Sequence, residues 1–307
     1  MNLLHRTQEL ESGGRPVCLA IGVFDGVHLG HQQVIRRAVS DAAQHGGQAV
    51  VITFDRHPDA VVAPARVPPL IYPLGKKLSV IGALGPETAC VVHFDKAFSQ
   101  ISGEEFIRGL WRDGRPIESI SVGGSFTFGW RRSGNVALLE ALGRELNFAV
   151  HGLAEVSLDG QPVSSTRVRE AVAEGRFGLA GQMLGRPYTL CGKVVKGTGL
   201  GRQIGVPTAN LDVTGLLTPP SGVYAAQAQV RGRTHLAAVN VGCRPTVEPA
   251  APKIAVEAHL LDFVGDIYQE EMELAFLAKL REEHKFPSLA ALREQILSDI
   301  ARVRNVP

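Results

Sequence analysis

Two histidines that follow an apolar stretch near the start of the chain could bind or react with a ligand. His28 and His31 lie three residues apart in FDGVHLGH, at the end of the apolar run Val17–Phe24. A helix start presents unpaired N–H groups and a partial positive charge, which attract phosphate. Imidazoles at this spacing share one helix face and could donate to phosphate oxygens. The segment therefore predicts a phosphate site, and a capped helix with incidental histidines is the alternative. A zinc pair would need further ligands, and no Cys or His cluster lies nearby in the sequence.

A second polar stretch, VSSTRVRE at 163–170, carries hydroxyl and guanidinium groups where a loop enters an expected helix. Ser164, Thr166 and Arg167 suit the charge of a polyphosphate. For this stretch alone, an ordinary helix cap with solvated arginines is the alternative. The two stretches together resemble the nucleotidyltransferases that use an HxGH motif and an ISSTxxR-type loop. That resemblance implies attack of a phosphate on the α-phosphorus of a nucleoside triphosphate, a reaction that depends on positioning and charge stabilisation.

A glycine-rich stretch in the second half, KGTGLGRQIGVPTAN at 196–210, could wrap a phosphate with backbone N–H groups. It is neither a Walker loop nor a Rossmann fingerprint, because the glycine spacing differs and no helix is expected after it. Thr208 and Asn210 point the same way in an extended segment, and their oxygens suit Mg²⁺. A simple turn is the alternative for Pro-Thr-Ala-Asn.

One carboxylate stands out further along the chain, in KIAVEAHLLDF at 253–263. Strand alternation places Ile254, Val256, Ala258 and Leu260 on one face. Glu257 falls on the other, mixed face, where a half-buried carboxylate could accept a proton from a hydroxyl. A surface glutamate on a barrel strand is the alternative.

The elements of the first half must hold the histidines. Apolar runs that predict strands alternate there with helical patterns, at 30–45, from Ser102, and at about 136–146. The runs are 17–24, 49–54, 89–94, 119–122 and 148–153. Alternation with nearly continuous apolar strands predicts a doubly wound parallel sheet over residues 1–184. Ligands bind beyond the carboxyl ends of such strands, where FDGVHLGH lies.

The second half changes character after Gly185. Short apolar runs separated by glycine and proline turns predict an antiparallel β-barrel over residues 185–307. The runs are 189–195, 223–230, 234–241, 254–261 and 271–280. A final helix is expected after Ser288, with leucines and isoleucines at helical spacing.

The composition excludes several classes of protein. Hydrophobic residues make up 45% of the 307, charged residues 20%, and the net charge is +2, with basic residues spread along the chain, so we expect no nucleic-acid partner. No apolar stretch reaches the ~18 residues of a membrane span, and no signal peptide is apparent. The cysteines lie in apolar runs without a CxxC pair, which predicts reduced core thiols in a cytoplasmic protein. They are Cys18, Cys90, Cys191 and Cys243.

The order of the motifs along nearly the whole chain resembles the bifunctional riboflavin kinase/FAD synthetase family. Besides the stretches above, the matching motifs are Thr53–Pro58, Phe126–Gly129, Gly222–Ala225, Asn240–Thr246 and Leu280–Phe286. The resemblance implies an enzyme that phosphorylates riboflavin to FMN with ATP and then adenylylates FMN to FAD, releasing pyrophosphate. It implies Mg²⁺, and as partners riboflavin, FMN, FAD and ATP. We expect a monomer or a weak homo-oligomer.

For the kinase module, the resemblance implies that Thr208 and Asn210 bind Mg²⁺. Glu257 would take the proton of the ribityl 5′-hydroxyl as it attacks the γ-phosphorus of ATP. Arg281 lies in the segment that covers the flavin. The glycines of the loop over the ATP phosphates would be Gly197, Gly199 and Gly201.

For the adenylyltransferase module, the resemblance implies that His28 and His31 contact the ATP phosphates as catalytic residues. The other ATP-binding positions would be Gly22, Phe24, Gly30, Ser164, Thr166 and Arg167. Ser125 stands at a flavin-binding position where the family usually has Asp or Asn. A hydroxyl there can still accept a hydrogen bond, but a kinase with a weakened or inactive adenylyltransferase module is the first alternative. A flavin-binding regulatory protein without turnover is the second.

Overall fold

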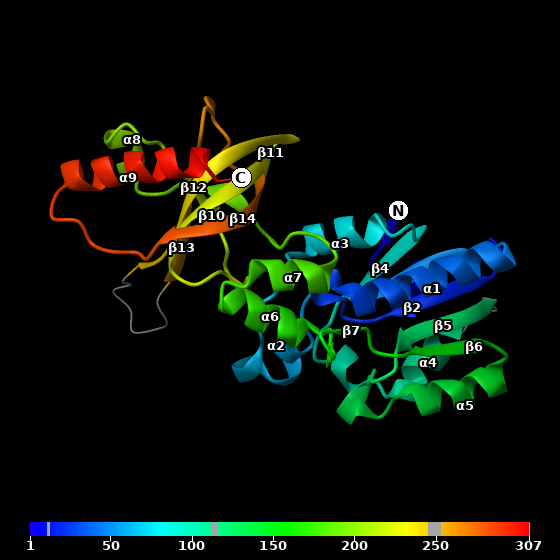
Figure 1. Cartoon of the computed structure of the whole chain (residues 1–307). Helices are drawn as coiled ribbons and strands as arrows, with labels where there is room; N and C mark the ends of the chain where they lie inside the picture. The colour runs from blue at the N-terminus through cyan, green and yellow to red at the C-terminus, as the bar shows by residue number, and fades with distance from the viewer. Residues whose placement is uncertain (11–12, 112–115, 245–252, 307) are drawn as a thin grey trace. The chain divides into compact units, whose positions relative to one another are not determined.

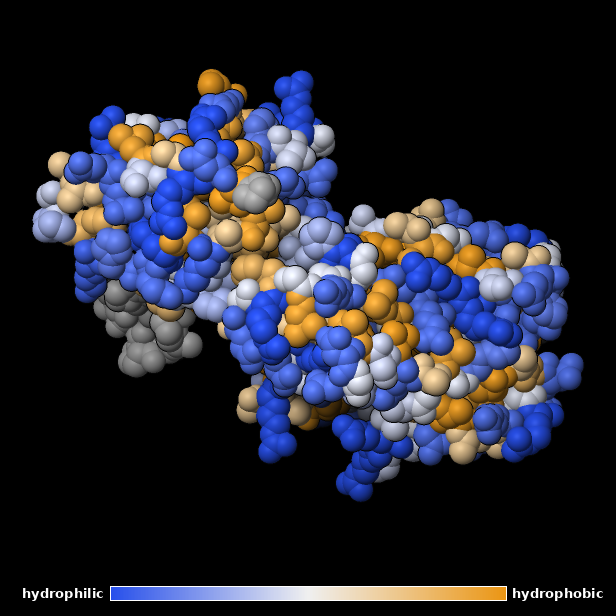
Figure 2. Space-filling model, viewed as in Figure 1, coloured by the Kyte–Doolittle hydropathy of each residue, from blue (hydrophilic) through white to orange (hydrophobic). Residues whose placement is uncertain are grey.

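The computed structural model describes residues 1–10, 13–111, 116–244 and 253–306. The chain divides into two compact units, which are described separately (Figure 1). The first comprises Met1–Leu70 with Leu74–Ser165, and the second comprises Ile71–Pro73 with Thr166–Pro307. Hydrophilic residues are interspersed with hydrophobic ones over the face drawn in Figure 2. Among the described residues, no helix is both long and apolar enough to cross a membrane.

The first unit is built on a six-stranded sheet in which every neighbouring pair of strands is parallel, in the order β1-β4-β3-β2-β5-β6. Its strands are β1 (Asn2–Leu4), β2 (Val17–Ile21), β3 (Gln48–Phe54), β4 (Thr88–Val92), β5 (Ile117–Gly123) and β6 (Ala149–Leu153). Every residue of β2, β3 and β4 is buried, as expected of parallel strands covered on both faces. The predicted doubly wound parallel sheet is confirmed.

Helices cover both faces of this sheet (Figure 1). The α-helices of the first unit are α1 (Leu29–His45), α2 (Asp59–Val62), α3 (Leu74–Gly82), α4 (Gly103–Trp111) and α5 (Val136–Leu146). Its 3₁₀ helices are η1 (Thr7–Glu9), η2 (Asp25–Val27), η3 (Pro64–Arg66), η4 (Phe98–Gln100) and η6 (Trp130–Arg132). Ile35 of α1 and Ile81 of α3 pack with Cys18 and Ala20 on one face. Successive residues of a strand point to opposite faces, so Leu19 and Ile21 pack with α4 and α5 on the other face.

The strand order reverses at β2. From β2 the chain adds β3 and β4 on one side, and it then returns to add β5 and β6 on the other side. The carboxyl end of β2 is therefore the switch point, where open α/β sheets hold their ligands. The segment that contains His28 and His31 begins there.

The second unit contains a closed barrel of six antiparallel strands in the order β10-β13-β12-β11-β14-β9, which confirms the predicted barrel. The strands are β9 (Thr189–Val195), β10 (Ala209–Asp212), β11 (Gly222–Val230), β12 (Arg233–Arg244), β13 (Lys253–Leu260) and β14 (Glu271–Arg281). The helices are α6 (Ser165–Ala173), α7 (Phe177–Leu184), α8 (Leu200–Gln203) and α9 (Leu289–Arg304). A separate two-stranded sheet pairs β7 (Ser157–Leu158) with β8 (Gln161–Pro162) in the first unit. Ser288 caps α9 as predicted, accepting a hydrogen bond from the Ala291 N–H.

A short helix, α8, lies inside the glycine-rich stretch 196–210 and begins after Gly199, whose φ is 77°, and the chain continues from that stretch in the strand β10. Two expectations about burial are wrong. Ile254 is exposed, although Val256 and Ala258 on the same strand face are buried. Cys243 is exposed at the end of β12, whereas the other three cysteines are buried. Pro245 and Thr246 lie outside the described residues.

A buried ion pair fastens α9 to the barrel. The Arg281 guanidinium, at the end of β14, donates to both oxygens of Asp299 on α9, with Nη2–Oδ2 at 2.8 Å and Nε–Oδ1 at 3.2 Å. The Asp299 side chain is 2% exposed and that of Arg281 17%. Gln295 donates to the same carboxylate. A guanidinium that donates to both oxygens of a carboxylate holds both side chains in one geometry, so this pair determines where α9 lies against β14.

We expect Asp299→Ala to lower the free energy of unfolding by about 3 kcal/mol, because it leaves a partly buried guanidinium without its counter-charge. Urea unfolding of the full chain, followed by circular dichroism, measures the change. Glu282→Ala is the control: it breaks an ion pair with Lys279 whose carboxylate is 78% exposed, and such pairs contribute about 1 kcal/mol or less. Equal losses for the two variants would contradict the assigned role of Asp299.

Candidate active sites

The turn that leads from β2 to α1 has an unusual backbone. Phe24, Gly26 and Val27 all have positive φ angles, of 53°, 76° and 43°. Glycine adopts such angles freely, but for a β-branched valine they are strained, and strain of this kind tends to be kept where function requires it. The Ser165 hydroxyl donates to the Asp25 carbonyl at 2.9 Å and helps to hold the turn.

His28 and His31 are brought together as a stacked pair. Their ring centroids are 3.6 Å apart and their planes differ by 22°. The His31 N–H donates to Nδ1 of His28 at 3.4 Å, so His28 caps α1. With Nδ1 as acceptor, the neutral ring of His28 carries its proton on Nε2 and can donate from there.

His31 is kept neutral. Burial is the largest cause that holds the pKa of His31 well below its ordinary value, and the neighbouring groups His28 and Lys77 act in the same direction. Its Nδ1 is buried and has no hydrogen-bond partner within the described part of the chain. Buried polar atoms usually have partners, so this nitrogen fits a site that is completed by a ligand.

Packing explains why Gly22 and Gly30 are glycines, because a side chain at either position would meet an aromatic ring. A Cβ on Gly22 would lie 2.8 Å from Cε1 of Phe24, and one on Gly30 would lie 3.2 Å from Cε1 of His28. These glycines therefore leave room for the two rings that shape the turn. Such close ring contacts were not foreseen from the sequence.

The second predicted phosphate stretch spans the division between the two units. Ser164 precedes α6 in the first unit, while Thr166 and Arg167 lie in the first turn of α6 and belong to the second. Thr166 is exposed and Arg167 is half-buried. Their approach to His28 stays a prediction.

An aromatic cavity of about 910 Å³ opens at the carboxyl ends of the parallel strands. Ile21 and Phe54 line it from the last positions of β2 and β3, and Phe94 lines it from two residues after β4. The other lining aromatic side chains are Phe98, Phe106, Phe126, Phe128 and Trp130. A cavity of this size and lining suits a flat aromatic ligand.

Ser125 does not line this cavity. It lies exposed in the turn directly after β5, while the next residues, Phe126 to Phe128, do line it. Arg131 and Arg132 stand at the cavity with positive φ angles of 51° and 57°. The cavity therefore combines an apolar lining with basic groups.

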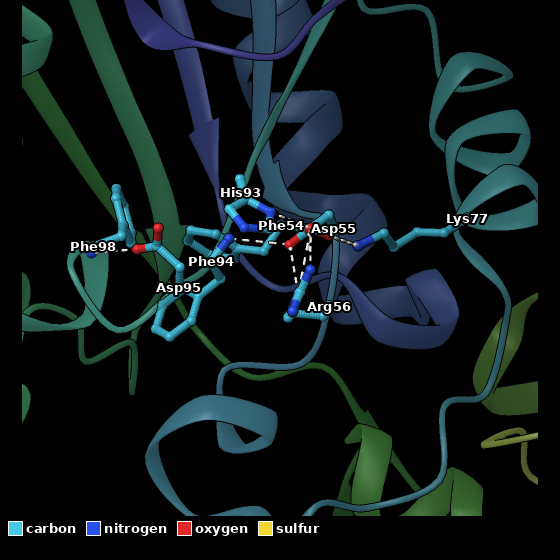
Figure 3. Close-up of polar contacts among 8 residues, drawn as sticks. All are labelled: Phe54, Asp55, Arg56, Lys77, His93, Phe94, Asp95 and Phe98. Carbon is cyan, nitrogen blue, oxygen red and sulfur yellow. Dashed lines mark hydrogen bonds and ion pairs between the residues drawn. The ribbon is translucent and has the colours of Figure 1, made fainter.

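A polar network that the sequence did not reveal ties the same strand ends together (Figure 3). Asp55, directly after β3, accepts from the Phe94 N–H at 3.0 Å and lies 2.7 Å from Nδ1 of His93. Burial works to raise the pKa of the Asp55 carboxyl, but hydrogen bonds from Phe94, Arg56 and His93 outweigh it and the pKa lies below its ordinary value. The sequence signals were the position of Asp55 at the end of a buried strand and its place in the matching motif Thr53–Pro58.

In the second unit, strand register aligns three polar residues. Glu257 on β13 is the direct partner of Asn210 on β10 and of Asn240 on β12. Directly paired residues in antiparallel strands have side chains on the same face, about 5 Å apart at Cβ. The carboxylate is thus flanked by two amides, one of which belongs to the predicted metal-binding pair.

The glycine-rich loop packs tightly on that pair. A Cβ on Gly197 would lie 2.7 Å from Oδ1 of Asn210, and one on Gly201 would lie 3.1 Å from Oγ1 of Thr208. The loop thus approaches Thr208 and Asn210 in a way that only glycine allows.

A cavity of about 750 Å³ brings most of the predicted kinase residues together. Gly201, Thr208, Glu257 and Arg281 line it, with the segment 283–286 and one side of α9. Gly197, Gly199 and Asn210 are not among its lining residues. Arg281 reaches the cavity while its guanidinium is held by Asp299, so its role is at least partly structural.

Two further residues of this site were missed in the sequence. Nδ1 of His259 lies 2.8 Å from the Pro207 carbonyl, which fixes the residue before Thr208. Glu283 accepts from the Asn240 amide at 3.4 Å. The alternation that placed His259 on the same strand face as Glu257 was a usable signal for the first residue, and the matching motif Leu280–Phe286 contains the second.

The residues present fit a magnesium ion that is held mainly by nucleotide phosphates. A threonine hydroxyl and an asparagine amide are hard oxygen donors, and Mg²⁺ is commonly bound by few protein groups with phosphates. Within the described residues, no group of three or more His, Cys, Asp and Glu could hold a metal ion by itself.

Family models match both halves of the chain. A model described as FAD synthetase covers residues 11–167, and one described as riboflavin kinase covers residues 184–306. The chain belongs to the bifunctional riboflavin kinase/FAD synthetase family. Both modules of the predicted enzyme are therefore present, in the predicted order.

Relatives match over nearly their full length. The chain is 36% identical over 304 residues to the bifunctional riboflavin kinase/FMN adenylyltransferase of Pseudomonas fluorescens, covering 99% of this chain and 97% of that protein. It is 33% identical over 301 residues to that of Escherichia coli K12, covering 97% and 96%. A structure described as a macrolide-efflux protein from Streptococcus pneumoniae superposes with a TM-score of 0.81 at 27% identity, covering 99% and 98%. That description concerns the streptococcal protein, and we use the likeness for the fold.

Proposed function

We propose that Glu257, with Thr208 and Asn210, carries riboflavin phosphorylation, and that His28 and His31 carry adenylyl transfer to FMN. The observation that supports the first half most directly is the strand register that sets Glu257 beside Asn210. For the second half it is the stacked histidine pair at the switch point of the sheet.

In the kinase step, Glu257 would accept the proton of the riboflavin 5′-hydroxyl as the oxygen bonds to the γ-phosphorus of ATP and ADP leaves. General-base help requires the carboxylate to be within hydrogen-bond reach of that hydroxyl, and the position of Glu257 in the cavity wall suits this. Thr208 and Asn210 would hold Mg²⁺, which when bound offsets the charge of the phosphates. Gly197 and Gly201 would let the loop backbone approach those phosphates.

In the adenylyl step, a phosphate oxygen of FMN would bond to the α-phosphorus of ATP as pyrophosphate leaves. The nucleophile is already an anion, so positioning and charge stabilisation suffice. His28 would donate from Nε2, the start of α1 would add its N–H groups, and Ser164, Thr166 and Arg167 would complete the binding of ATP.

The flavin ring of FMN would occupy the aromatic cavity of the first unit, because its apolar walls suit a planar ring and Arg131 and Arg132 suit the attached phosphate. Ser125 bears on the alternative of a weakened module. It lies outside the cavity lining, so the loss of a carboxylate or amide there leaves the aromatic walls intact. We therefore favour an active adenylyltransferase. We also propose a cytoplasmic location and a monomer or weak homo-oligomer.

Glu257→Gln is expected to slow FMN formation about 100-fold or more while riboflavin still binds, because the amide keeps the shape but takes no proton. The measurement is the rate of FMN formation by chromatography together with riboflavin binding by fluorescence. FAD formation from added FMN is the internal control and should stay unchanged. An unchanged rate of FMN formation would reject the role of Glu257 as base.

His28→Ala is expected to lower FAD formation from FMN about 100-fold, because it removes a phosphate donor and the cap of α1. FMN formation from riboflavin should stay within about twofold, since its proposed site lies in the other unit. Both products are followed by chromatography. If both rates fell equally, the assignment of one reaction to each unit would be wrong.

A further inference from the structure

One buried lysine joins the ends of two strands in the first unit. Lys77 on α3 is 7% exposed. Its Nζ donates to the Phe54 carbonyl at 2.7 Å, the Thr53 hydroxyl at 3.1 Å and the Val23 carbonyl at 3.3 Å. An ammonium has three N–H donors, so all three are used. A buried charge is costly unless it is hydrogen-bonded in this way.

The three acceptors lie next to two parts of the proposed adenylyltransferase site, the turn toward His28 and the aromatic cavity. Val23 directly precedes Phe24, the left-handed residue that opens the turn toward His28. Phe54 is the last residue of β3, and its ring lines the aromatic cavity. The Thr53 hydroxyl also donates to the Val23 carbonyl at 3.0 Å, so the two strand ends are linked twice. Figure 3 shows the Lys77 side chain reaching from its helix toward Phe54.

We propose that Lys77 is a positioning residue for adenylyl transfer. Its ammonium fixes the end of β2 against the end of β3, and so holds the histidine pair in place relative to the cavity for the flavin. The proposal rests on the proposed function of the first unit. Because small displacements of reacting groups lower the reaction rate strongly, hydrogen bonds that hold the two strand ends together affect turnover.

Lys77 affects the site through its charge as well as through its hydrogen bonds. The charged and titratable groups that interact with it are Asp25 of η2, Asp55 after β3 and His31 of α1. Burial lowers the pKa of Lys77 to about 8, although Asp25 and Asp55 act against the shift. The positive charge is one of the causes that keep His31 neutral. Above that pKa the amine has two N–H groups for three acceptors, so one strand-end contact is lost.

The test compares Lys77→Met and Lys77→Arg with the wild-type full chain, with Lys76→Met on the same helix as the matched control. FAD formation from FMN and FMN formation from riboflavin are both measured from about pH 6.5 to about 9.5. We expect Lys77→Met to lower kcat for FAD formation about tenfold or more, with FMN formation within about twofold of wild type. Lys76→Met should leave both rates within about twofold.

The pH dependence of FAD formation shows whether Lys77 acts through its charge or only through the packing of its side chain. Wild-type FAD formation should fall as the pH rises through about 8, where Lys77 loses its proton. Lys77→Arg keeps its charge throughout this range, so the fall should be absent in that variant. FMN formation in the same samples controls for general effects of pH.

Two results would overturn the proposal: FAD formation by Lys77→Met within about twofold of wild type, or an alkaline fall in Lys77→Arg that matches wild type. If Lys77→Met fails to fold in the first unit, the profile of Lys77→Arg decides alone. His28→Ala keeps this test distinct from that of the proposed function. If that variant still makes FAD at the wild-type rate, the proposed site is wrong, whatever the Lys77 variants show.

Discussion

The hydrogen-bonded register of neighbouring strands is the constraint on which both sites depend. In the barrel, the pairing of β13 with β10 and β12 sets Glu257 between Asn210 and Asn240. A shift of one residue would turn Glu257 to the opposite face and replace it with an apolar neighbour. In the sheet, Ile21 pairs with Ile52, so β2 and β3 end close together and their following turns meet at one edge. Chemistry-bearing side chains are thus placed by backbone pairing before they touch a ligand.

The two units reinforce this register by different means. In the barrel, glycines let the loop pack on Thr208 and Asn210, and the Arg281–Asp299 pair holds α9 beside the cavity. In the sheet, polar groups join adjacent strand ends: the buried Lys77 links β2 to β3, and the partly buried Asp55 links the end of β3 to Phe94, two residues after β4. Burying polar groups costs free energy unless they have hydrogen-bond partners, and groups whose hydrogen bonds are complete can hold strand ends together.

Much of the fold was predictable from two patterns. Continuous apolar runs, as in β2 and β3, predict buried strands, and glycine and proline predict the turns between strands. The helix α3 was missed, since its sequence LGKKLSVIG contains two lysines and one of them is buried against the usual pattern. The strand alternation around Glu257 predicted its face, but its partner Asn210 depends on register, which one sequence does not reveal. Likewise Arg281 was assigned to the flavin segment, while its ion pair with Asp299 arises only when α9 packs on the barrel.

In this proposal one chain carries out two steps in sequence, each at its own site. The most direct test is a chromatographic time course of the purified full chain with riboflavin, ATP and Mg²⁺. We expect FMN to appear first and FAD to follow as FMN is consumed. FMN that accumulates without any FAD, or the absence of both products, would contradict it.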